Sequence, residues 1–429
     1  MKLLIVGGGG REHALAWSLR RSTAVREVRC APGNAGMATI ARCVDIRAED
    51  TDALVDHATS ERYDLVIVGP EAPLVAGLAD RLRAAHVAVF GPSAAAAEIE
   101  GSKVFAKRFM ARHGIPTGTF RVFDERAAAV RFLEDADYPL VVKADGLAAG
   151  KGVVLCPDRD GAVAVAERML AGEAFGIAGR RIVVEEMLRG REVSFLVLSD
   201  GERVVELPPC QDYKRVHDGD LGPNTGGMGC YSPSAYLDDA TRRRLLETIV
   251  MPTISGLRTE NRPYRGVLYV GVMLTADGPR VLEYNARFGD PETQVLVPRL
   301  DGDWLELLAA CAHGTLERVA PRWRRETAVC VVMASRGYPG PYAAGVPIEG
   351  VDDAGAQPGT TVFHAGTSLA SDRLTTSGGR VLGVTALGAD LAQARARAYD
   401  AVSRIRFEGA HYRTDIAQDA LRARRENET

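Results

Sequence analysis

The sequence lacks any apolar run approaching the roughly 20 residues that a membrane-spanning helix needs. The apolar stretch within its first six residues ends at four glycines and is too short for a signal peptide. Seven cysteines lie far apart without a Cys-x-x-Cys pair, which is typical of a reduced, cytosolic protein without a structural zinc site. The formal net charge of −3 argues against a nucleic-acid-binding protein, which would carry a broad basic surface. We therefore expect a cytoplasmic protein, by default a monomer, that binds neither membranes nor nucleic acid.

Lysine is scarce as well, since only six of the 53 basic residues are lysine. A compact ammonium and a planar guanidinium do different chemistry, so the lysines that remain are informative. Lys103, Lys143, Lys151 and Lys214 fall within the most unusual local sequences of the chain, whereas Lys2 and Lys107 look incidental. The first group therefore supplies candidates for a functional site, while Lys2 and Lys107 are left out.

The chain of 429 residues, with 46% hydrophobic and 25% charged residues, has the size and balance of a soluble multidomain protein. We expect an amino-terminal parallel α/β (Rossmann-like) domain over residues 1–101. A central α+β domain follows over residues 102–325, with a small lid at about 120–190. A mixed α/β domain over residues 326–429 completes the chain.

In the first domain, short apolar runs separated by helical stretches predict a parallel sheet of βαβ units. Ligands of such sheets gather at the carboxyl ends of the strands, where the turns Gly7–Gly10, Gly69–Glu71 and Gly91–Ser93 fall. The predicted strands are Leu3–Val6, Val25–Cys30, Leu65–Val68 and Val87–Phe90, with a helix over Arg11–Arg20. A second helix is predicted over Ser102–His113, with Ser102 as its N-cap.

The glycine run before the first helix fits a dinucleotide fingerprint poorly. Glu12 stands at the third glycine position, and Cys30–Gly33 replaces the acidic residue that would hold a ribose. A glycine turn at a helix amino terminus still favours an anion such as a phosphate. Gly9, Gly10 and Arg11 are therefore candidate substrate contacts. The alternative is a tight turn with Arg11 on the surface.

The stretch from Val141 to Val154 holds two of the scarce lysines around a glycine-rich turn. It fails as a Walker A loop, because three residues separate Gly146 from Gly150 and Gly152 stands where Ser or Thr would bind magnesium. β-rich runs on both sides predict a strand–loop–strand hairpin instead. Lys143 on the strand and Lys151 in the loop suit a flap that folds over a polyphosphate. A surface hairpin with two solvated lysines is the alternative.

Carboxylates mark the ends of two further apolar strands. Glu185 and Glu186 end one strand and Glu192 follows, which suits contacts to an adenine and its ribose or, alternatively, solvated side chains. Glu283 and Asn285 project from one face of a second strand, because side chains alternate on an extended chain. Such an oxygen pair suits magnesium.

Arg287 lies just beyond that second strand, and its guanidinium can donate two parallel hydrogen bonds to a carboxylate or a transferring phosphoryl group. The alternative for residues 283–292 is a polar strand edge. Residues 211–229, rich in Gly and Pro, predict a long loop that is either functional or a structural Ω-loop. The side chains of this loop that could contact a substrate are Asp212, Lys214, Asn224 and Thr225.

Taken together, these segments closely resemble the phosphoribosylamine–glycine ligases (glycinamide ribonucleotide synthetases) of the ATP-grasp superfamily, over essentially the whole chain. A small departure is Gly8, where relatives commonly carry Asn. The segments that carry the resemblance are GGREHALAW (9–17), APGNAG (31–36), VGPEAPL (68–74), FGPS (90–93), KADGLAAGKGV (143–153), QDYKRV (211–216), GPNTGGMG (222–229), NARFGDPETQ (285–294) and VFHAGT (362–367).

The resemblance implies that ATP, glycine and 5-phosphoribosylamine are converted to glycinamide ribonucleotide, ADP and phosphate in purine biosynthesis, through glycyl phosphate. It implies an ATP-grasp fold for the central domain and Mg²⁺ or Mn²⁺ as the metal, held by Glu283 and Asn285. It implies catalytic roles for Arg287 and Lys143. The implied ATP contacts are Lys103, Lys143, Lys151, Glu185, Glu186, Leu188 and Glu192. The implied substrate contacts are Gly9, Gly10, Arg11, Asp212, Lys214, Asn224, Thr225, Arg287, Gly289 and Asp290.

Two other functions are compatible with the same motifs. Another ATP-grasp ligase would join a different carboxylate or amine. A non-catalytic nucleotide-binding module would bind ATP without turnover, although the presence of Lys143, Glu283 and Asn285 argues against it. The residues from 326 onward carry no chemistry that the sequence identifies.

Overall fold

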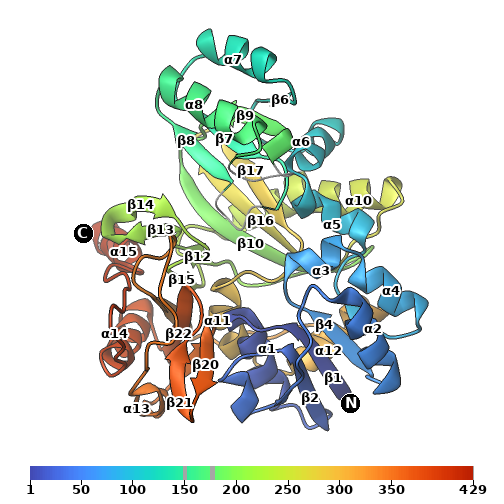
Figure 1. The fold of residues 1–429 in the computed structure, drawn as a ribbon, viewed down its shortest axis with the longest axis vertical. Helices are drawn as coiled ribbons and strands as arrows, with labels where there is room; N and C mark the ends of the chain where they lie inside the picture. The colour runs from blue at the N-terminus through green and yellow to red at the C-terminus, as the bar shows by residue number, and fades with distance from the viewer. Residues whose placement is uncertain (148–151, 174–178, 429) are drawn as a thin grey trace.

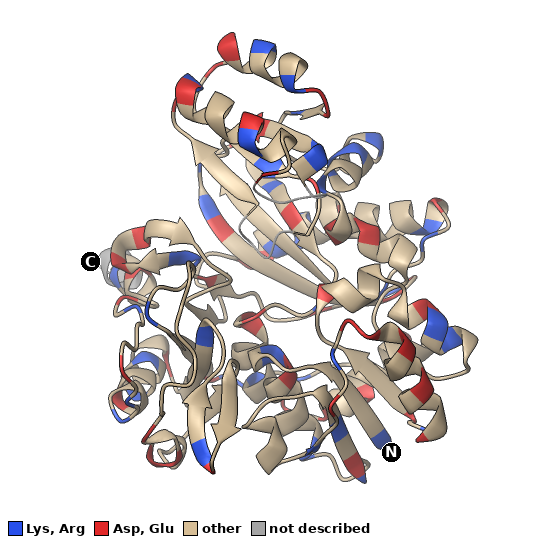
Figure 2. Cartoon of the chain, in the orientation of Figure 1, with Lys and Arg blue, Asp and Glu red and all other residues tan. Residues whose placement is uncertain are grey.

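A computed structural model describes residues 1–147, 152–173 and 179–428 of the chain, and Figure 1 shows how its elements are arranged. The predicted loop lysine, Lys151, lies outside the described residues. Within those residues, no helix is long and apolar enough to span a membrane. Positive and negative side chains are interspersed over the described residues (Figure 2), in line with the small net charge.

The amino-terminal domain contains the predicted parallel sheet, with the strand order β3-β2-β1-β4-β5. The order reverses between β1 and β4, and a sheet of this type binds ligands beside that point. The strands are β1 (Lys2–Gly7), β2 (Glu27–Pro32), β3 (Arg42–Cys43), β4 (Leu65–Val68) and β5 (Val89–Phe90). The helices are α1 (Gly10–Leu19), α2 (Thr51–Ser60), α3 (Glu71–Val75), α4 (Leu78–Ala84) and α5 (Ala94–Gly101).

The predicted hairpin belongs to a separate four-stranded antiparallel sheet, which lies at the top of Figure 1 in green. Lys143 pairs with Val153 across it, so the strand–loop–strand prediction is confirmed. Two helices pack on the sheet and form a small core with it around Val142, Ala162 and Ile182. The elements are β6 (Phe120–Phe123), α7 (Arg126–Glu134), β7 (Leu140–Ala144), β8 (Val153–Cys156), α8 (Arg159–Leu170) and β9 (Ile182–Glu186).

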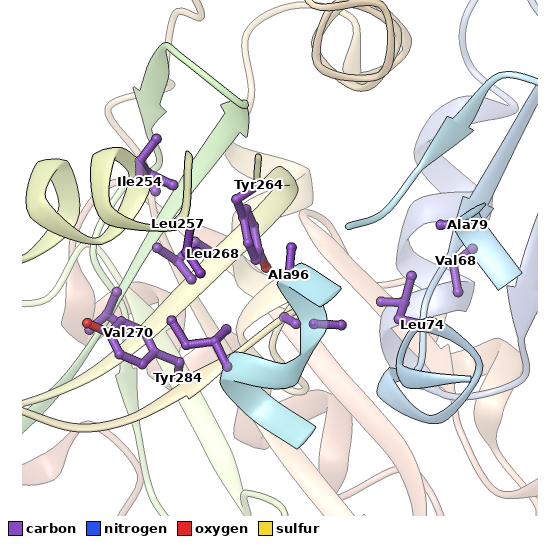
Figure 3. Packing of buried hydrophobic residues seen from close by; sticks show 14 of the residues in the cluster. Val68, Leu74, Ala79, Ala96, Ile254, Leu257, Tyr264, Leu268, Val270 and Tyr284 are labelled. Atoms are coloured by element: carbon purple, nitrogen blue, oxygen red, sulfur yellow. The ribbon is translucent and has the colours of Figure 1, made fainter. Parts of the chain in front are cut away.

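The central sheet has the order β11-β10-β16-β17 and shares one hydrophobic core with the amino-terminal domain. Figure 3 shows this packing, with Leu257 next to Leu268 and with Ala96 of α5 next to Tyr264. Ser102 caps α6 by accepting a hydrogen bond from the Phe105 N–H (3.0 Å), as predicted. The elements are α6 (Lys103–Arg112), β10 (Arg191–Asp200), β11 (Val204–Glu206), α9 (Asp239–Leu245), α10 (Met251–Thr259), β16 (Arg265–Thr275), β17 (Gly278–Asn285), α11 (Glu292–Leu296) and α12 (Trp304–His313).

A third sheet, of order β12-β15-β18-β22-β19, gathers the carboxy-terminal strands. Two of its strands come from residues 211–232, so this sheet extends across the boundary predicted at 325/326. The elements are β12 (Gln211–Asp212), β15 (Gly229–Ser232), β18 (Thr327–Ala334), α13 (Val351–Gly355), β19 (Thr360–His364), β20 (Thr367–Ala370), β21 (Arg373–Thr376), β22 (Arg380–Gly388), α14 (Leu391–Val402) and α15 (Gln418–Glu428).

The prediction of an unbroken loop over residues 211–229 is wrong. This segment contains β12, the start of β15 and a hairpin of β13 (Arg215–His217) and β14 (Leu221–Asn224) between them. These strands are two to four residues long, too short to leave a periodic pattern in a sequence rich in Gly and Pro.

Candidate active site

A cleft of about 1120 Å³ lies between the lid sheet, the central sheet and the other two domains. It brings together side chains from segments as distant as Arg11 and Arg380. Most of the predicted site residues line it. These are Arg11, Lys103, Lys143, Glu185, Glu186, Leu188, Glu192, Asp212, Lys214, Asn224, Thr225, Glu283, Asn285, Arg287 and Asp290.

Four of the six lysines line this cleft, namely Lys103, Lys107, Lys143 and Lys214. Lys103 donates to the Gly146 carbonyl (3.2 Å) at the start of the hairpin turn. Burial lowers the pKa of Lys103, because the charged form loses hydration. Lys2 lies elsewhere and is ion-paired to Glu61 (2.6 Å), so it is structural.

Lys107 is not incidental, contrary to the prediction from the sequence. It forms an ion pair with Glu185, and Lys143 pairs with the other oxygen of the same carboxylate. All three side chains are at least 93% buried. Burial disfavours the charged form of Glu185, yet the two ammonium groups keep its pKa below the usual value. Glu185 therefore fixes two lysines in place at the floor of the cleft.

Glu186, the next residue, is used differently. Its carboxylate accepts hydrogen bonds from the Thr119 N–H (2.8 Å) and from Arg280 (3.1 Å), and it is partly exposed. Further along the cleft, Glu192 pairs with Lys214. Leu188 adds an apolar patch to the same wall.

Glu283 and Asn285 both line the cleft from β17, as their alternation on a strand predicts. Burial would raise the pKa of Glu283, but Lys214 and Lys143 bring it down to about 2. Its Oε1 lies 3.4 Å from Lys214 Nζ. The buried amide Nδ2 of Asn285 has no hydrogen-bond partner in the described structure.

The donors on this strand are thus an ionised carboxylate and a side-chain amide. No group of three or more His, Cys, Asp or Glu side chains suited to a metal occurs among the described residues. A magnesium ion accepts such a pair, because it completes its shell with water and phosphate oxygens. The residues present therefore fit a divalent metal held jointly by the protein and a nucleotide.

Arg287 turns into a cluster of arginines and glutamates beside the amino-terminal sheet. Its guanidinium lies 3.3 Å from Glu71 and 3.5 Å from Glu100. Arg11 reaches the same Glu71 at 3.7 Å. Burial raises the pKa of Glu100 to about 7, whereas Arg287 and Arg11 overcome burial at Glu71 and hold its pKa at about 2. The cluster is at the switch point of the sheet, where the strand order reverses.

The predicted anion turn holds an anion of the protein itself. Glu12, with 1% of its surface exposed, accepts a hydrogen bond from the Gly9 N–H (2.7 Å) and pairs with Arg11 (2.5 Å). A side chain at Gly69 would approach the Glu12 carboxylate to 2.0 Å, so the turns after β1 and β4 close around it. Gly9 and Gly10 are not among the residues that line the cleft, and Gly10 is buried against Gln294 and Asp290. Gly289 is likewise covered, by Glu292.

Residues 212–225 form one wall of the cleft. Burial and the nearby Glu292 raise the pKa of Asp212 well above its usual value, and its buried Oδ1 has no partner among the described residues. The Thr225 hydroxyl donates to the Lys214 carbonyl (2.8 Å) and accepts from the Gly227 N–H (3.0 Å), so it holds the segment together.

Arg380 belongs to the site, although no sequence motif indicated it. This residue of the third sheet lines the cleft and donates to the carbonyls of Asp290 (2.5 Å) and Gly226 (2.7 Å). Burial opposes its charge, but Asp290 raises its pKa further. The carboxy-terminal domain therefore supplies a cation that joins two of the substrate segments. Tyr338 and Tyr342 of the same domain also line the cleft. VFHAGT, the motif of that domain, runs from β19 to the start of β20, and none of its residues lines the cleft.

Comparisons with known proteins identify the family. Three family models of phosphoribosylglycinamide synthetase match in order: the N domain over residues 1–100, the ATP-grasp (A) domain over 101–293 and the C domain over 328–419. The chain belongs to the phosphoribosylglycinamide synthetase family. The resemblance inferred from the motifs and the ATP-grasp fold of the central region are thereby confirmed.

Similar proteins span the whole chain. The phosphoribosylamine–glycine ligase of Rhizobium meliloti (strain 1021) is 49% identical over 421 residues, covering 98% of this chain and 99% of that protein. The ligase of Escherichia coli O157:H7 is 48% identical over 430 residues, with coverages of 98% and 99%. The crystal structure of the Thermotoga maritima ligase has a TM-score of 0.86 and 33% identity, covering 97% of this chain and all of that one. Biotin carboxylase from Campylobacter jejuni (TM-score 0.74, 15% identity) shares the fold alone.

Proposed function

We propose that this cleft ligates glycine to 5-phosphoribosylamine at the expense of ATP, giving glycinamide ribonucleotide, ADP and phosphate in purine biosynthesis. The observation that carries the proposal is the convergence of Lys103, Lys143, Glu283, Asn285 and Arg287 in one cleft. The family relationship supplies the substrates, because the similar proteins over the full length are named for this ligation.

The chemistry suits a site of charges without a protein nucleophile. A carboxylate is a poor electrophile, so glycine must first accept the γ-phosphoryl group of ATP, which makes glycyl phosphate and releases ADP. The amine of phosphoribosylamine then attacks the carbonyl carbon, the C–O bond to phosphate breaks, and the nitrogen loses a proton. Both steps depend on positioning and on neutralising developing charge.

Lys103 and Lys143 hold the phosphates in this proposal, and Lys151 is proposed to do the same. Lys107 and Glu185 act beneath them, because the shared carboxylate keeps the Lys143 ammonium in place. The end of β9, with Glu185, Glu186 and Leu188, seats the adenine, and Glu192 approaches the ribose. These positions form one continuous wall of the cleft.

Glu283 and Asn285 would hold Mg²⁺ or Mn²⁺ together with phosphate oxygens. When bound, the metal neutralises charge on the phosphates during phosphoryl transfer. The pKa of about 2 keeps Glu283 ionised at any physiological pH, so it stays able to bind a cation. Lys214 lies beside it, with its Nζ 3.4 Å from the Glu283 Oε1, and adds positive charge there.

The two substrates occupy the remaining side of the cleft. Arg287, oriented by Glu71 and Glu100, faces the reacting carboxylate. Asp212, Lys214, Asn224, Thr225 and Asp290 surround the substrates, the last of them fixed by Arg380. Arg11 anchors phosphoribosylamine from the amino-terminal side, while Gly9, Gly10 and Gly289 shape the backbone beneath. The lid, at about residues 120–190, closes over the cleft and excludes water from glycyl phosphate.

Phosphate release from the purified protein tests the function. We expect release from ATP when glycine and phosphoribosylamine are both present, with one glycinamide ribonucleotide formed per phosphate. Phosphate release that does not depend on glycine or on phosphoribosylamine would point to another ATP-grasp ligase. ATP binding without phosphate release would point to a non-catalytic binding module. We also propose that the enzyme acts as a cytoplasmic monomer without nucleic-acid or membrane partners. Sedimentation of the active protein measures its oligomeric state and so tests the monomer.

A further inference from the structure

One side chain in the cleft wall of residues 212–225 turns away from the cleft. Asp212 and Lys214 line the cleft, whereas Tyr213 between them does not. Tyr213 is 6% exposed and belongs to the core cluster of the carboxy-terminal domain, which includes Val331 and Ile416. Tyr213 therefore joins two proposed substrate contacts to the carboxy-terminal core.

The Tyr213 hydroxyl is held at the start of α15. It donates a hydrogen bond to the Asp419 carboxylate and accepts one from the Ala417 N–H (3.0 Å). Figure 1 shows α15, in red, beside the hairpin of β13 and β14. Burial opposes the charge of Asp419, but hydrogen bonds from Tyr213 and Tyr236 and the charge of Arg191 hold its pKa below the usual value. The bond from Tyr213 is thus made to an ionised acceptor, which makes it about twice as strong as a neutral one.

Asp419 is at one end of a row of hydrogen bonds that joins residues 411–419 to residues 213–220. At the centre of the row, the buried Arg413 donates to the Arg215 carbonyl (3.2 Å) and to Asp220 (2.7 Å), and its guanidinium lies 5.0 Å from the centroid of the Tyr213 ring. The other bonds run from His411 Nε2 to the Val216 carbonyl (2.7 Å), from the Thr414 N–H to Asp218 (2.8 Å) and from the Gly219 N–H to Asp415 (2.8 Å). Residues 411–419 therefore support this wall of the cleft along its length.

The Asp419 carboxylate also reaches the segment that carries Glu192. Its Oδ2 accepts hydrogen bonds from Arg191 (2.5 Å) and from the Tyr236 hydroxyl (2.9 Å). Arg191 precedes Glu192, which pairs with Lys214. The two segments are thus joined directly by Glu192 and Lys214, and a second time through Asp419, which does not line the cleft.

We infer that Asp419 is a positioning residue for the ligation, which holds the Tyr213 hydroxyl and thereby keeps Asp212 and Lys214 directed into the cleft. The inference rests on the proposed function, in which these two side chains contact the substrates. Reaction rates depend steeply on such placement, because reacting groups must meet in a narrow range of distances and orientations. Side chains that do so are typically fixed by hydrogen bonds to residues behind them.

Steady-state kinetics of three variants test this role. Asp419→Ala and Tyr213→Phe each remove one side of the hydrogen bond, and the double variant removes both. Each single variant should raise the KM for glycine or phosphoribosylamine about tenfold in assays run well below the unfolding transition, with a smaller change in kcat. The double variant should raise it no further than Asp419→Ala, because the two side chains act through one bond.

Two further variants separate positioning from stability. Asp419→Asn loses the charge that pairs with Arg191 but keeps an oxygen that can accept the Tyr213 O–H, so its KM values should stay within about twofold of the native ones. Asp400→Ala is the matched control, because this carboxylate is on α14, is 56% exposed and pairs with Arg404 (3.1 Å). Its KM values should equal those of the native protein.

Amide hydrogen exchange reports on the same wall without requiring turnover. The Thr225 N–H donates to the Lys214 carbonyl (2.7 Å), and the Met228 N–H donates to the Tyr213 carbonyl (2.8 Å). Exchange at these two amides should be about tenfold faster in Asp419→Ala and Tyr213→Phe than in the native protein, and unchanged in Asp400→Ala.

The outcomes are distinct. Native KM values in Asp419→Ala would overturn the role of Asp419, and so would native exchange rates in that variant or an Asp419→Asn variant as impaired as Asp419→Ala. If the native protein forms no glycinamide ribonucleotide, the proposed function fails, whereas faster exchange in Asp419→Ala and not in Asp419→Asn still supports the hold of Asp419 on this wall.

Discussion

Replacing Glu185 by Gln removes the carboxylate that two buried lysines share. The side chains involved are nearly inaccessible, with 5% of Glu185, 4% of Lys107 and 7% of Lys143 exposed. The substitution keeps the shape of the side chain and removes the ion-pair partner of both ammonium groups. We expect it to destabilise the folded protein and to displace Lys143 from the phosphate site.

The magnitude follows from burial. Removing one partner of a buried ion pair typically costs about 3–5 kcal/mol, because the other charge stays desolvated. Lys107 keeps its hydrogen bond to Thr117 (2.7 Å) and Lys143 keeps one to the Leu282 carbonyl (3.1 Å), so we expect about 3 kcal/mol. Glu186→Gln is the matched control. That carboxylate is 38% exposed and pairs with Arg280, which is worth about 0–1 kcal/mol.

Urea unfolding of both variants, with and without MgATP, measures the difference. Glu185→Gln should lie about 2–3 kcal/mol below Glu186→Gln in the absence of nucleotide. MgATP should stabilise Glu185→Gln less than the native protein, because displacement of Lys143 weakens nucleotide binding. Equal stabilities for the two variants would refute the idea that Glu185 holds the lysines in place.

Three further outcomes are expected. The raised pKa of Glu100, about 7 against an ordinary 4.5, means that the folded state binds its proton more tightly, so its contribution to stability falls by about 3 kcal/mol as pH rises from 4.5 to 7. Glu100→Gln should remove that slope in urea unfolding at pH 5 and pH 8, and an unchanged slope would contradict it. Glu283→Gln should lower kcat about 100-fold or more, because it removes the charged metal ligand, and activity near that of the native protein would rule this role out. Arg380→Gln should raise the KM for glycine or phosphoribosylamine about tenfold, by loss of a charged hydrogen bond at Asp290, with the KM for ATP unchanged. A rise confined to ATP would place Arg380 on the other side of the cleft.

Features that depend on neighbours in the sequence could be predicted. Ser102 caps α6 because its side chain reaches an N–H three residues away. The hairpin around Lys143 follows from two β-rich runs and a glycine turn. Glu283 and Asn285 share a face because strand side chains alternate. The scarcity of lysine also carried information, since four of the six line the cleft.

Features that depend on distant partners could not be predicted. Lys107 looks like any basic residue on a helix, because its partner Glu185 is 78 positions away on another sheet. Glu12 occupies the turn in which a bound anion was expected. The turn after β4, which is distant in the sequence, closes around the Glu12 carboxylate in the folded chain. Arg380 reaches Asp290 from a strand that begins 90 residues later in the chain. The short strands of residues 211–229 belong to a sheet in which β15 pairs with β18, and this distant partner cannot be inferred from the local sequence.

A crystal structure with a non-hydrolysable ATP analogue, Mg²⁺ and glycine tests the central claim most directly. The account predicts the triphosphate between Lys103 and Lys143, the metal bridging it to Glu283 and Asn285, and the glycine carboxylate facing Arg287. A triphosphate bound away from Lys143 and Glu283 would contradict it.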